Sequence, residues 1–391
     1  MATHSYPQFS DGDVEIHLST DPSDKYILHS YVLALHSPWF KASISERWNS
    51  GGTGNTSFIG IGGSSAVGGK SRWIYELHFD EDSQLGMLVK KATTPRATQM
   101  ISSSHTKLHS DSPNVTIRLH AERIGSAKAH QDMLGTLYHL APAFSHENFE
   151  NAKASILLLA NVADIYGCQH VTKMHIESHL RLYRTEVLEL CAKDPLDMLE
   201  LAMAVKSEWI FMEAATNLIG RSKRFFESSQ LQLSKLGIAD LMDTKRTELR
   251  EKLQACEYEM FRMQPVTTED WKHIVAINYF RQWLSERLKD GQGSELAPGY
   301  GDLYHSICST SASVRAARKP KVLDFTTILF NNAAETINEL MPSVNTAFDS
   351  AAAIVQPLRQ DTTRRQSKHS DMHRSLTFMG IGDEELPWVK K

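Results

Sequence analysis

Apolar and polar residues alternate at every second position in two short runs near the start of the chain. These runs are Val14–Leu18 and Lys25–Leu28, and the turn-forming sequence Asp-Pro-Ser-Asp lies between them at 21–24. A period of two is typical of half-buried β-strands, and a turn between two such runs predicts a hairpin. Residues 73–79 alternate in the same way and predict another strand.

Two short helices are expected after the hairpin. The apolar segment 31–35 has the length of a short helix and ends before Ser37-Pro38. A serine side chain accepts a hydrogen bond from the first turn of a helix, and a proline at the first helical position sacrifices no hydrogen bond. The pair therefore predicts a second helix, with Phe40 and Ile44 on its apolar face.

Helical periodicity dominates the chain after residue 128. Apolar residues recur every three or four positions in segments at 129–140, 152–167, 170–192 and 208–226, and in a long amphipathic stretch at 232–263. Asp194-Pro195, followed by the acid Asp197, predicts the start of another helix that ends near residue 206.

The C-terminal third has weaker patterns. Thr267 and Asp270 have the spacing of a capping box and predict a helix that carries Ile277 and Phe280. A helix is expected at 321–341, before an alanine-rich piece. The stretch 359–374 holds five Arg and Lys against two Asp, which predicts a basic disordered tail.

Two polar stretches separate the predicted strands. Residues 49–72 are rich in glycine and serine, and residues 80–113 are rich in serine and threonine. Loops of this length without structure of their own are typical of insertions. Val115–Leu119 indicates one more strand.

Composition and charge limit the classes of protein to which this chain can belong. The 391 residues are 41% hydrophobic, enough for two or three domains with sizeable cores. A net charge of −4 argues against nucleic acid as the main partner. The wholly apolar runs are too short to span a membrane. Four scattered cysteines and an N-terminus without a secretory signal predict an intracellular protein, cytoplasmic or nuclear.

The stretch DVEIHLSTDPSDKYILHSYVLALHSPWFKASI, residues 13–44, resembles the opening of the BTB/POZ domain. The residues that match the family pattern are Asp13, Val14, His29, Val32, Leu33, Ala34, Ser37 and Phe40. MLGTLYHLAPAF at 133–144 and ILLLANVADIYGCQHV at 156–171 resemble two helices of the same domain, the second closed by a glycine. With its insertions and helical C-terminal half, the chain is most similar to BTB-domain proteins of filamentous fungi.

The resemblance implies an organisation in three parts. An α+β BTB/POZ domain with long insertions at about 49–72 and 80–130 is expected over residues 1–185. An α-helical extension of the BACK type is expected over 186–290. Residues 291–391 are expected to be weakly structured and to end in the disordered tail.

The resemblance also implies a function. BTB domains self-associate, and some members recruit a substrate to a cullin-type ubiquitin ligase. Their first strand and first helix commonly form the dimer face. A homodimer through residues 6–40 is therefore expected, with Phe9, Val14, Tyr31 and Leu35 in contact with the second copy and with partner choice in the helices after 185.

A glycine-rich run at 60–72 ends in Gly69-Lys70-Ser71, as a phosphate-binding loop does. That loop needs another glycine at position 64, but the nearest one is Gly63, and a strand follows where a helix is required. We therefore expect no nucleotide to bind here.

Two pairs of polar residues have alternative interpretations. Asp13 and His29 have the residue types of a catalytic pair, but the family resemblance favours a structural pair that ties the hairpin to the first helix. His175 and His179 lie one helical turn apart, a spacing that zinc uses, yet no third ligand has matching spacing. Solvated histidines are the favoured interpretation of the second pair.

Two further patterns are compatible with binding. The run of Leu249, Leu253, Cys256, Met260 and Met263 spans about two heptads, which favours packing within its own domain over a coiled coil with another chain. The basic residues of the tail fit a nuclear-import or phosphate-contacting patch, but a solvated tail is favoured. These basic residues are Arg364, Arg365, Lys368 and Arg374.

The function expected is a non-enzymatic protein–protein interaction module without cofactor or metal. One alternative is a transcription-associated or chromatin scaffold that uses the same domain. Another is an enzyme whose site carries no recognised motif. Binding to a cullin separates the first two functions, and a deep polar pocket with perturbed pKa values favours the third.

Overall fold

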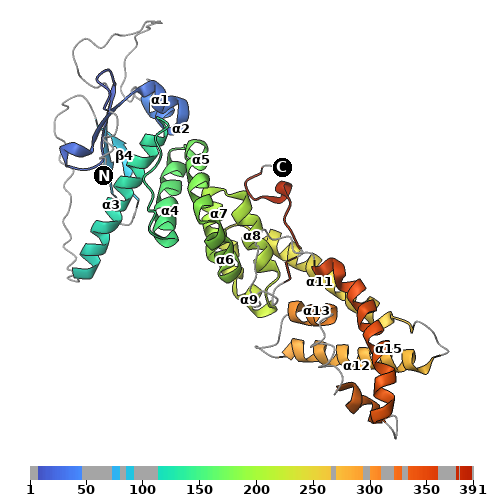
Figure 1. The fold of residues 1–391 in the computed structure, drawn as a ribbon. Helices are drawn as coiled ribbons and strands as arrows, with labels where there is room; N and C mark the ends of the chain where they lie inside the picture. Colours follow the sequence, from blue (N-terminus) through green and yellow to red (C-terminus); the bar gives the residue numbers. More distant parts are fainter. Residues whose placement is uncertain are drawn as a thin grey trace. The chain divides into compact units, whose positions relative to one another are not determined.

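The computed structural model describes residues 8–45, 73–79, 85–91, 113–265, 270–293, 300–309, 321–327, 333–359, 376–377 and 379–389. The chain divides into two compact units, Met1–Tyr183 and Arg184–Lys391, called unit 1 and unit 2 below (Figure 1). Unit 1 combines a small sheet with helices, and the described part of unit 2 is helical. This mixed content agrees with the expected α+β class.

Four strands form the sheet of unit 1 in the order β2-β1-β3-β4. They are β1 (Val14–His17), β2 (Lys25–Leu28), β3 (Trp73–His78) and β4 (Met87–Lys90). β1 pairs antiparallel with β2 and parallel with β3, and β4 pairs antiparallel with β3. The predicted hairpin and the strand at 73–79 are confirmed. β4 was not predicted, because it lies in a stretch expected to be an insertion.

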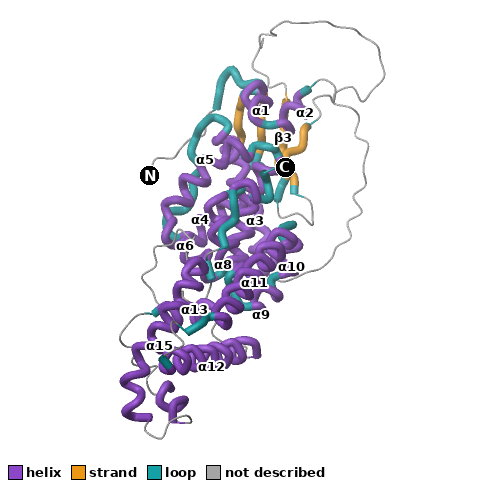
Figure 2. Tube along the Cα trace, turned by 90° about the vertical axis from the view of Figure 1, so that its right-hand side faces the viewer, coloured by secondary structure: helices purple, strands orange, loops and turns teal. Residues whose placement is uncertain are grey.

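One face of the sheet belongs to the core of unit 1. Val14 and Ile16 of β1 and Tyr75 of β3 are completely buried, as expected when alternate residues of a strand point to the same side. Figure 2 shows the strands beside two short helices, α1 (Ser30–His36) and α2 (Pro38–Ile44). The ring of Phe40 from α2 packs on that of Tyr75, with centroids 5.8 Å apart.

Ser37 begins α2 as the sequence predicts. Its hydroxyl oxygen accepts a hydrogen bond from the Phe40 N–H at 3.1 Å, and Pro38 occupies the first turn. The same hydroxyl donates to the carbonyl oxygen of Tyr166 at 2.6 Å. Gly167 follows Tyr166 with a φ of +67°, and a Cβ there would lie 3.0 Å from Pro38. The predicted glycine closure of the helix before it is confirmed, and it also fits against α2.

Three longer helices and two short 3-10 turns complete the described part of unit 1. These are η1 (Pro22–Asp24), α3 (Pro113–Thr136), α4 (Phe149–Ile165), α5 (Gln169–Leu180) and η3 (Arg181–Tyr183). The strand predicted at Val115–Leu119 is wrong, because this run belongs to α3. Its β-branched residues favour a strand, but a helix satisfies its own backbone hydrogen bonds whereas an isolated strand does not.

Tyr166 lies at the centre of a buried polar network in unit 1. Its hydroxyl oxygen accepts a hydrogen bond from the Leu88 N–H of β4 at 2.8 Å and lies 3.1 Å from Nε2 of His130 in α3. Nδ1 of His130 lies 2.8 Å from the Ser126 carbonyl oxygen. Since a carbonyl oxygen only accepts, Nδ1 is the protonated nitrogen of His130, and Nε2 accepts from Tyr166. The network connects the sheet edge to two helices.

The structure describes nine named helices and two short 3-10 turns in unit 2. They are α6 (Arg184–Lys193), α7 (Pro195–Val205), α8 (Glu208–Ile219), α9 (Lys223–Ser228), α10 (Gln230–Lys235), α11 (Ala239–Arg262), α12 (Trp271–Gly293), α13 (Tyr300–Cys308), α15 (Ala333–Val355), η4 (Gln356–Arg359) and η6 (Asp383–Glu385). The predicted start of α7 is confirmed, because the Asp194 carboxylate accepts from the Asp197 N–H. No helix in the described ranges is long and apolar enough to cross a membrane.

Three segments predicted as single helices are interrupted. The segment 170–192 contains η3, between α5 and α6. The segment 208–226 breaks after Gly220, where Ser222 caps α9 by accepting from the Phe225 N–H. The stretch 232–263 breaks at Gly237, whose φ of +71° favours glycine. The apolar period continues across each break, which is why the sequence pattern did not reveal it.

The helix predicted at 321–341 also differs from the structure. Residues 321–327 are helical, while α15 continues through Pro342 and the alanine-rich piece to Val355. Phe348 of α15 packs on Phe280 and Trp283 of α12, with ring centroids 5.0 and 4.9 Å apart. This packing offsets the backbone hydrogen bond that Pro342 removes.

The described end of the chain is not disordered as predicted. Leu376, Met379, Ile381 and Leu386 are all buried. The Leu376 N–H donates to the Gly220 carbonyl oxygen at 3.4 Å. The predicted basic residues of the tail lie outside the described residues, as does the glycine-rich loop with Lys70. The weakly structured region is therefore wrong for α15 and for 376–389.

Candidate interaction surface

α1 is fixed to the hairpin by a carboxylate. One oxygen of Asp13 accepts the Ser30 N–H at 2.7 Å, and the other accepts the Ser30 hydroxyl at 2.6 Å. Asp13 thereby supplies the capping interaction that the residue before the helix, His29, does not make. The expected pairing of Asp13 with His29 is wrong, because the Asp13 carboxylate connects the hairpin to the first helix through Ser30.

His29 contacts other groups from the same position. Its N–H donates to the Tyr138 hydroxyl at 2.8 Å, and its Nε2 lies 3.3 Å from a carboxylate oxygen of Asp11. A hydrogen bond with His29 lowers the pKa of Asp11. The ring of Phe9 packs on His29 and Tyr138, with centroids 4.5 and 5.0 Å away. Asp13 and His29 thus hold the N-terminus of α1 through separate contacts, with Ser30 and with Tyr138 respectively.

The other residues of the predicted motif hold the inner side of α1 and α2. Leu33, Ser37 and Phe40 are buried, and Ala34 is half-buried. Val14, predicted to contact a second copy, is also completely buried. That prediction is wrong for a physical reason. Val14 shares the inward side of β1 with Ile16, so the outward positions of the strand belong to Glu15 and His17.

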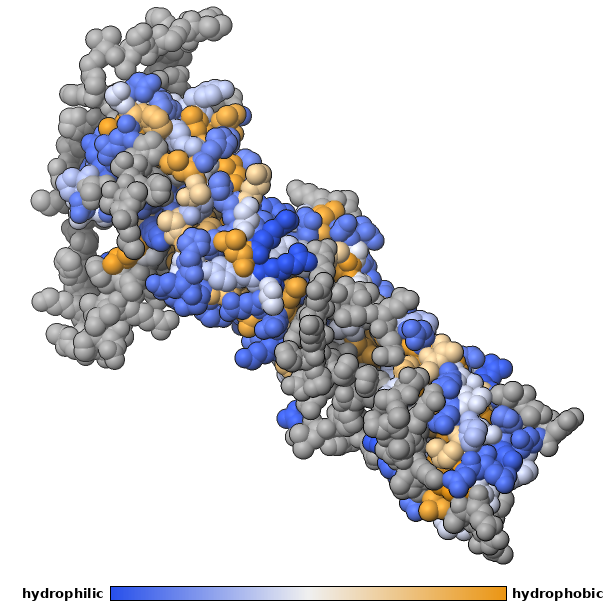
Figure 3. Space-filling model, in the orientation of Figure 1, coloured by the Kyte–Doolittle hydropathy of each residue, from blue (hydrophilic) through white to orange (hydrophobic). Residues whose placement is uncertain are grey.

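Tyr31 and Leu35 form an exposed ridge on α1, called the α1 ridge below. Their exposed fractions are 75% and 62%, and a spacing of four residues puts them on one face of the helix. Phe9 is half-buried and packed against the start of α1. Figure 3 shows apolar and polar residues mixed on the surface around α1 and α2. Three of the four predicted contact residues therefore reach the surface.

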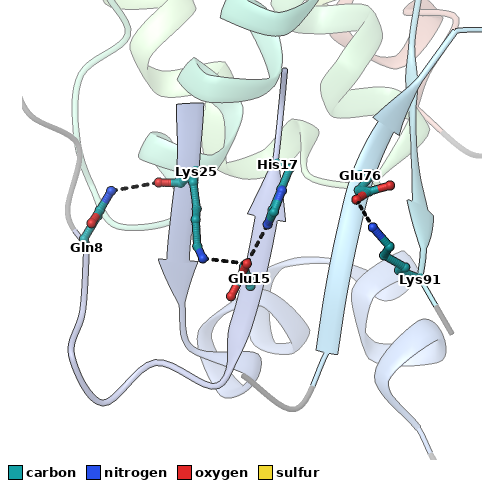
Figure 4. Close-up of polar contacts among 6 residues, drawn as sticks. All are labelled: Gln8, Glu15, His17, Lys25, Glu76 and Lys91. Carbon is teal, nitrogen blue, oxygen red and sulfur yellow. Dashed lines mark hydrogen bonds and ion pairs between the residues drawn. The ribbon is translucent and has the colours of Figure 1, made fainter. Parts of the chain in front are cut away.

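The outer face of the sheet has a different character (Figure 4). Glu15 lies 2.7 Å from the Lys25 ammonium and 2.6 Å from Nε2 of His17. Glu76 lies 2.6 Å from the Lys91 ammonium, and this hydrogen bond lowers the pKa of Glu76. Charged pairs across strands favour a solvated face. Met87 and Val89 of β4 are also exposed on this face, so charged pairs and apolar side chains lie next to each other there.

Three imidazoles border the end of the α1 ridge. The ring of His36 lies 6.3 Å from that of His139 and 6.2 Å from that of His170. Burial lowers the pKa of His36, and the charges of His170 and His139 lower it further. No pattern in the sequence connects these residues, because they come from α1, from the turn after α3 and from α5. Only the fold brings them together.

The predicted pair His175 and His179 have separate surroundings. His179 is buried against Phe144, with its Nε2 3.2 Å from the Ser145 carbonyl oxygen. Burial is the main cause that lowers the pKa of both imidazoles. In the described ranges, no group of three or more His, Cys, Asp or Glu is placed to hold a metal ion. The interpretation of His179 as a solvated histidine is wrong.

A shallow hollow of about 340 Å³ follows one side of α5. Side chains of both charge signs and one methionine line it: His170, Lys173, Met174, Glu177, Ser178 and Arg181. Met174 is largely exposed. The hollow lies on the same helix as His170 of the imidazole group, so it extends the surface beside the α1 ridge.

The heptad-like run of α11 packs inside unit 2. Leu249, Leu253, Met260 and Met263 are buried within this unit, so the favoured interpretation of packing within its own domain is confirmed.

Of the predicted capping box before α12, Thr267 lies outside the described residues. The Asp270 carboxylate accepts a hydrogen bond from the Lys272 N–H at 2.9 Å at the start of α12.

No family model matches this chain, and no curated protein or solved structure matches it. The BTB/POZ assignment therefore stays a prediction, which rests on the residues of 13–44, 133–144 and 156–171.

Proposed function

We propose that this chain is a non-enzymatic protein–protein interaction module that self-associates through the α1 ridge of unit 1. The observation that carries the proposal is that α1 is held firmly on its inner side and exposes large apolar side chains on its outer side. Its inner side is fixed by Asp13, Leu33 and the Tyr138 hydroxyl, while Tyr31 and Leu35 stand exposed on its outer side. Large apolar side chains held rigidly at a surface are typical of contact anchors.

The resemblance to BTB/POZ domains supports the same surface. The hairpin and the two short helices after it follow the order that the resemblance implies. In a symmetric dimer the same patch contacts itself, so Tyr31 and Leu35 of both copies would lie close to one axis. A stable dimer buries roughly 2,000 Å² or more, which requires Phe9 and other residues of 6–40 as well.

The oligomeric state tests this proposal directly. We expect the wild-type chain to be a dimer at tens of micromolar by size exclusion with light scattering, and the variant Tyr31→Glu/Leu35→Arg to be a monomer with an unchanged far-UV circular dichroism spectrum. Leu231→Arg is the matched control, because Leu231 of α10 is 71% exposed and lies in unit 2. A wild-type monomer at that concentration contradicts the proposal, and so does a dimer that the double variant leaves intact.

The resemblance further supports a role as a substrate adaptor of a cullin-type ubiquitin ligase. Unit 1 would then bind the cullin and unit 2 the substrate. A pulldown with purified cullin tests this step separately from self-association. Dimerisation without cullin binding would favour the alternative of a transcription-associated or chromatin scaffold.

A further inference from the structure

Residues 376–389, called the C-terminal segment below, lie on the helices of unit 2 in the manner of a bound peptide. In the described residues of this segment, 376–377 and 379–389, the one regular element is the three-residue η6. Four apolar anchors are buried: Leu376, Met379, Ile381 and Leu386. Burial of this kind resembles peptide recognition, in which spaced side chains fill pockets while the backbone remains irregular.

The start of the C-terminal segment fits closely against the end of α8. The Leu376 N–H donates to the Gly220 carbonyl oxygen, and a Cβ on Gly220 would lie 2.2 Å from the Leu376 carbonyl oxygen. The φ of −76° and ψ of −7° at Gly220 suit any residue. Glycine is therefore required here for the approach of the segment, and the helix itself does not need it.

An ion pair fixes the other end of the C-terminal segment. Lys245 of α11 is only 10% exposed, and its ammonium lies 2.7 Å from Oε1 of Glu385. Oε2 of Glu385 accepts the Gly382 N–H at 2.9 Å, which orients the carboxylate. Burial lowers the pKa of Lys245, but Glu385 and Glu248 raise it by more. A buried ammonium strongly favours an acidic partner.

The chemistry of the two sides is complementary. α11 presents Lys245 between the buried residues Met242 and Leu249, and α8 presents Phe211, whose ring lies 5.4 Å from that of Trp388. The C-terminal segment supplies three consecutive acids, Asp383–Glu385, next to Leu386. The surface of α8 and α11 thus recognises apolar anchors followed by an acid, a leucine and an aromatic residue.

We propose that the α8–α11 surface is a peptide-docking site, and that the C-terminal segment occupies it as an intramolecular ligand. When this segment leaves, the site binds a partner protein's segment of the same apolar-acidic chemistry. Sixteen residues, 360–375, connect the segment to η4, so a partner competes against a covalently attached ligand. This inference concerns unit 2 and does not depend on the α1 ridge.

The test uses the full chain and a fluorescein-labelled peptide with the sequence of residues 374–391. The wild-type chain should bind this probe weakly, since its site is filled. The variant Glu385→Arg places a cation against Lys245 and weakens the attached segment, so we expect the probe to bind at least about tenfold more tightly. Fluorescence anisotropy measures both affinities. A probe with Glu385→Ser and Leu386→Ser should bind neither chain.

Two variants separate docking from a general loss of structure. Adding Lys245→Glu to Glu385→Arg restores an ion pair of reversed sign, so probe binding should return to the wild-type level. In Gly220→Ala the added methyl group blocks the backbone of both the attached segment and the probe. This variant should therefore release its segment and still fail to bind the probe. Hydrogen exchange of residues 376–389 reports release in each chain.

Three results would overturn the proposal. The first is an affinity for the probe that stays at the wild-type level in Glu385→Arg and also in the double variant Glu385→Arg/Leu386→Asp. The segment would then be a fixed part of the core. Another is tight probe binding by Gly220→Ala, which would place the probe elsewhere. A wild-type dimer that Gly220→Ala dissociates would identify a second copy of this chain as the occupant in place of a different protein.

Discussion

His130 should make the stability of unit 1 fall steeply in mild acid. This imidazole is completely buried, and burial lowers its pKa from 6.5 to about 4. In the unfolded chain the imidazole binds a proton below its ordinary pKa, whereas the folded chain resists protonation until about pH 4. The contribution of neutral His130 is therefore complete above pH 6.5 and is lost as the pH falls from 6.5 to 4. A shift of this size corresponds to about 3 kcal/mol of unfolding free energy.

The variant His130→Gln isolates this contribution from the other titrating groups. At pH 7.5 it should be less stable by roughly 1–3 kcal/mol, because the hydrogen bonds to Ser126 and Tyr166 are disturbed. The advantage of the wild type should then fall by about 3 kcal/mol on going to pH 4, so that the variant becomes equally stable or more stable there. The stability difference within unit 1 is measured by urea unfolding, with hydrogen exchange of the peptide that contains the Leu88 N–H as the readout.

A matched control is Ser178→Ala, which changes an exposed residue of the same unit that does not titrate in this pH range. Its stability difference from wild type should stay constant between pH 7.5 and pH 4. If the difference for His130→Gln were equally constant, the folded chain would protonate this imidazole as readily as the unfolded chain does, and the inference that burial keeps His130 neutral in mild acid would be wrong.

Two other substitutions probe the packing and the capping of unit 1. Phe40→Ala should cost on the order of 3–5 kcal/mol, since Phe40 is completely buried against Tyr75 and Tyr166; an unchanged melting temperature would show that the core lies elsewhere. Asp13→Ala should cost roughly 1–2 kcal/mol by removing both hydrogen bonds to Ser30, and Asp13→Asn should recover part of this loss in urea unfolding; equal losses in both variants would contradict a capping role.

Local patterns predicted the parts of the fold that local interactions determine. The hairpin follows from alternation around a turn, and the start of α2 follows from Ser37-Pro38, whose cap is made within three residues. β4 could not be predicted in this way. Its four residues gain their structure from β3 and from the Tyr166 hydroxyl, 78 positions away. The same holds for Leu376, whose order depends on Gly220.

The candidate surface was predictable to a similar extent. A helical period identifies Tyr31 and Leu35 as one face, but it does not say whether that face is covered. Val14 was misplaced because the family resemblance was followed there, whereas the alternation puts Val14 with Ile16 on the apolar side of β1, which is the buried side. The grouping of His36 with His139 and His170 depends on tertiary structure alone, so their spacing in the sequence does not predict it.

The parallel pairing of β1 with β3 has a consequence for synthesis on the ribosome. β1 finds its first neighbour, β2, within a few residues, but 44 residues separate Leu28 from Trp73. At about 5–20 residues per second, the second edge of β1 stays unpaired for roughly 2–9 seconds after the hairpin has been made. An open strand edge is a template for aggregation. The charges of Glu15 and Lys25 on the outer face therefore have a second use, as protection of the nascent chain against pairing with its neighbours.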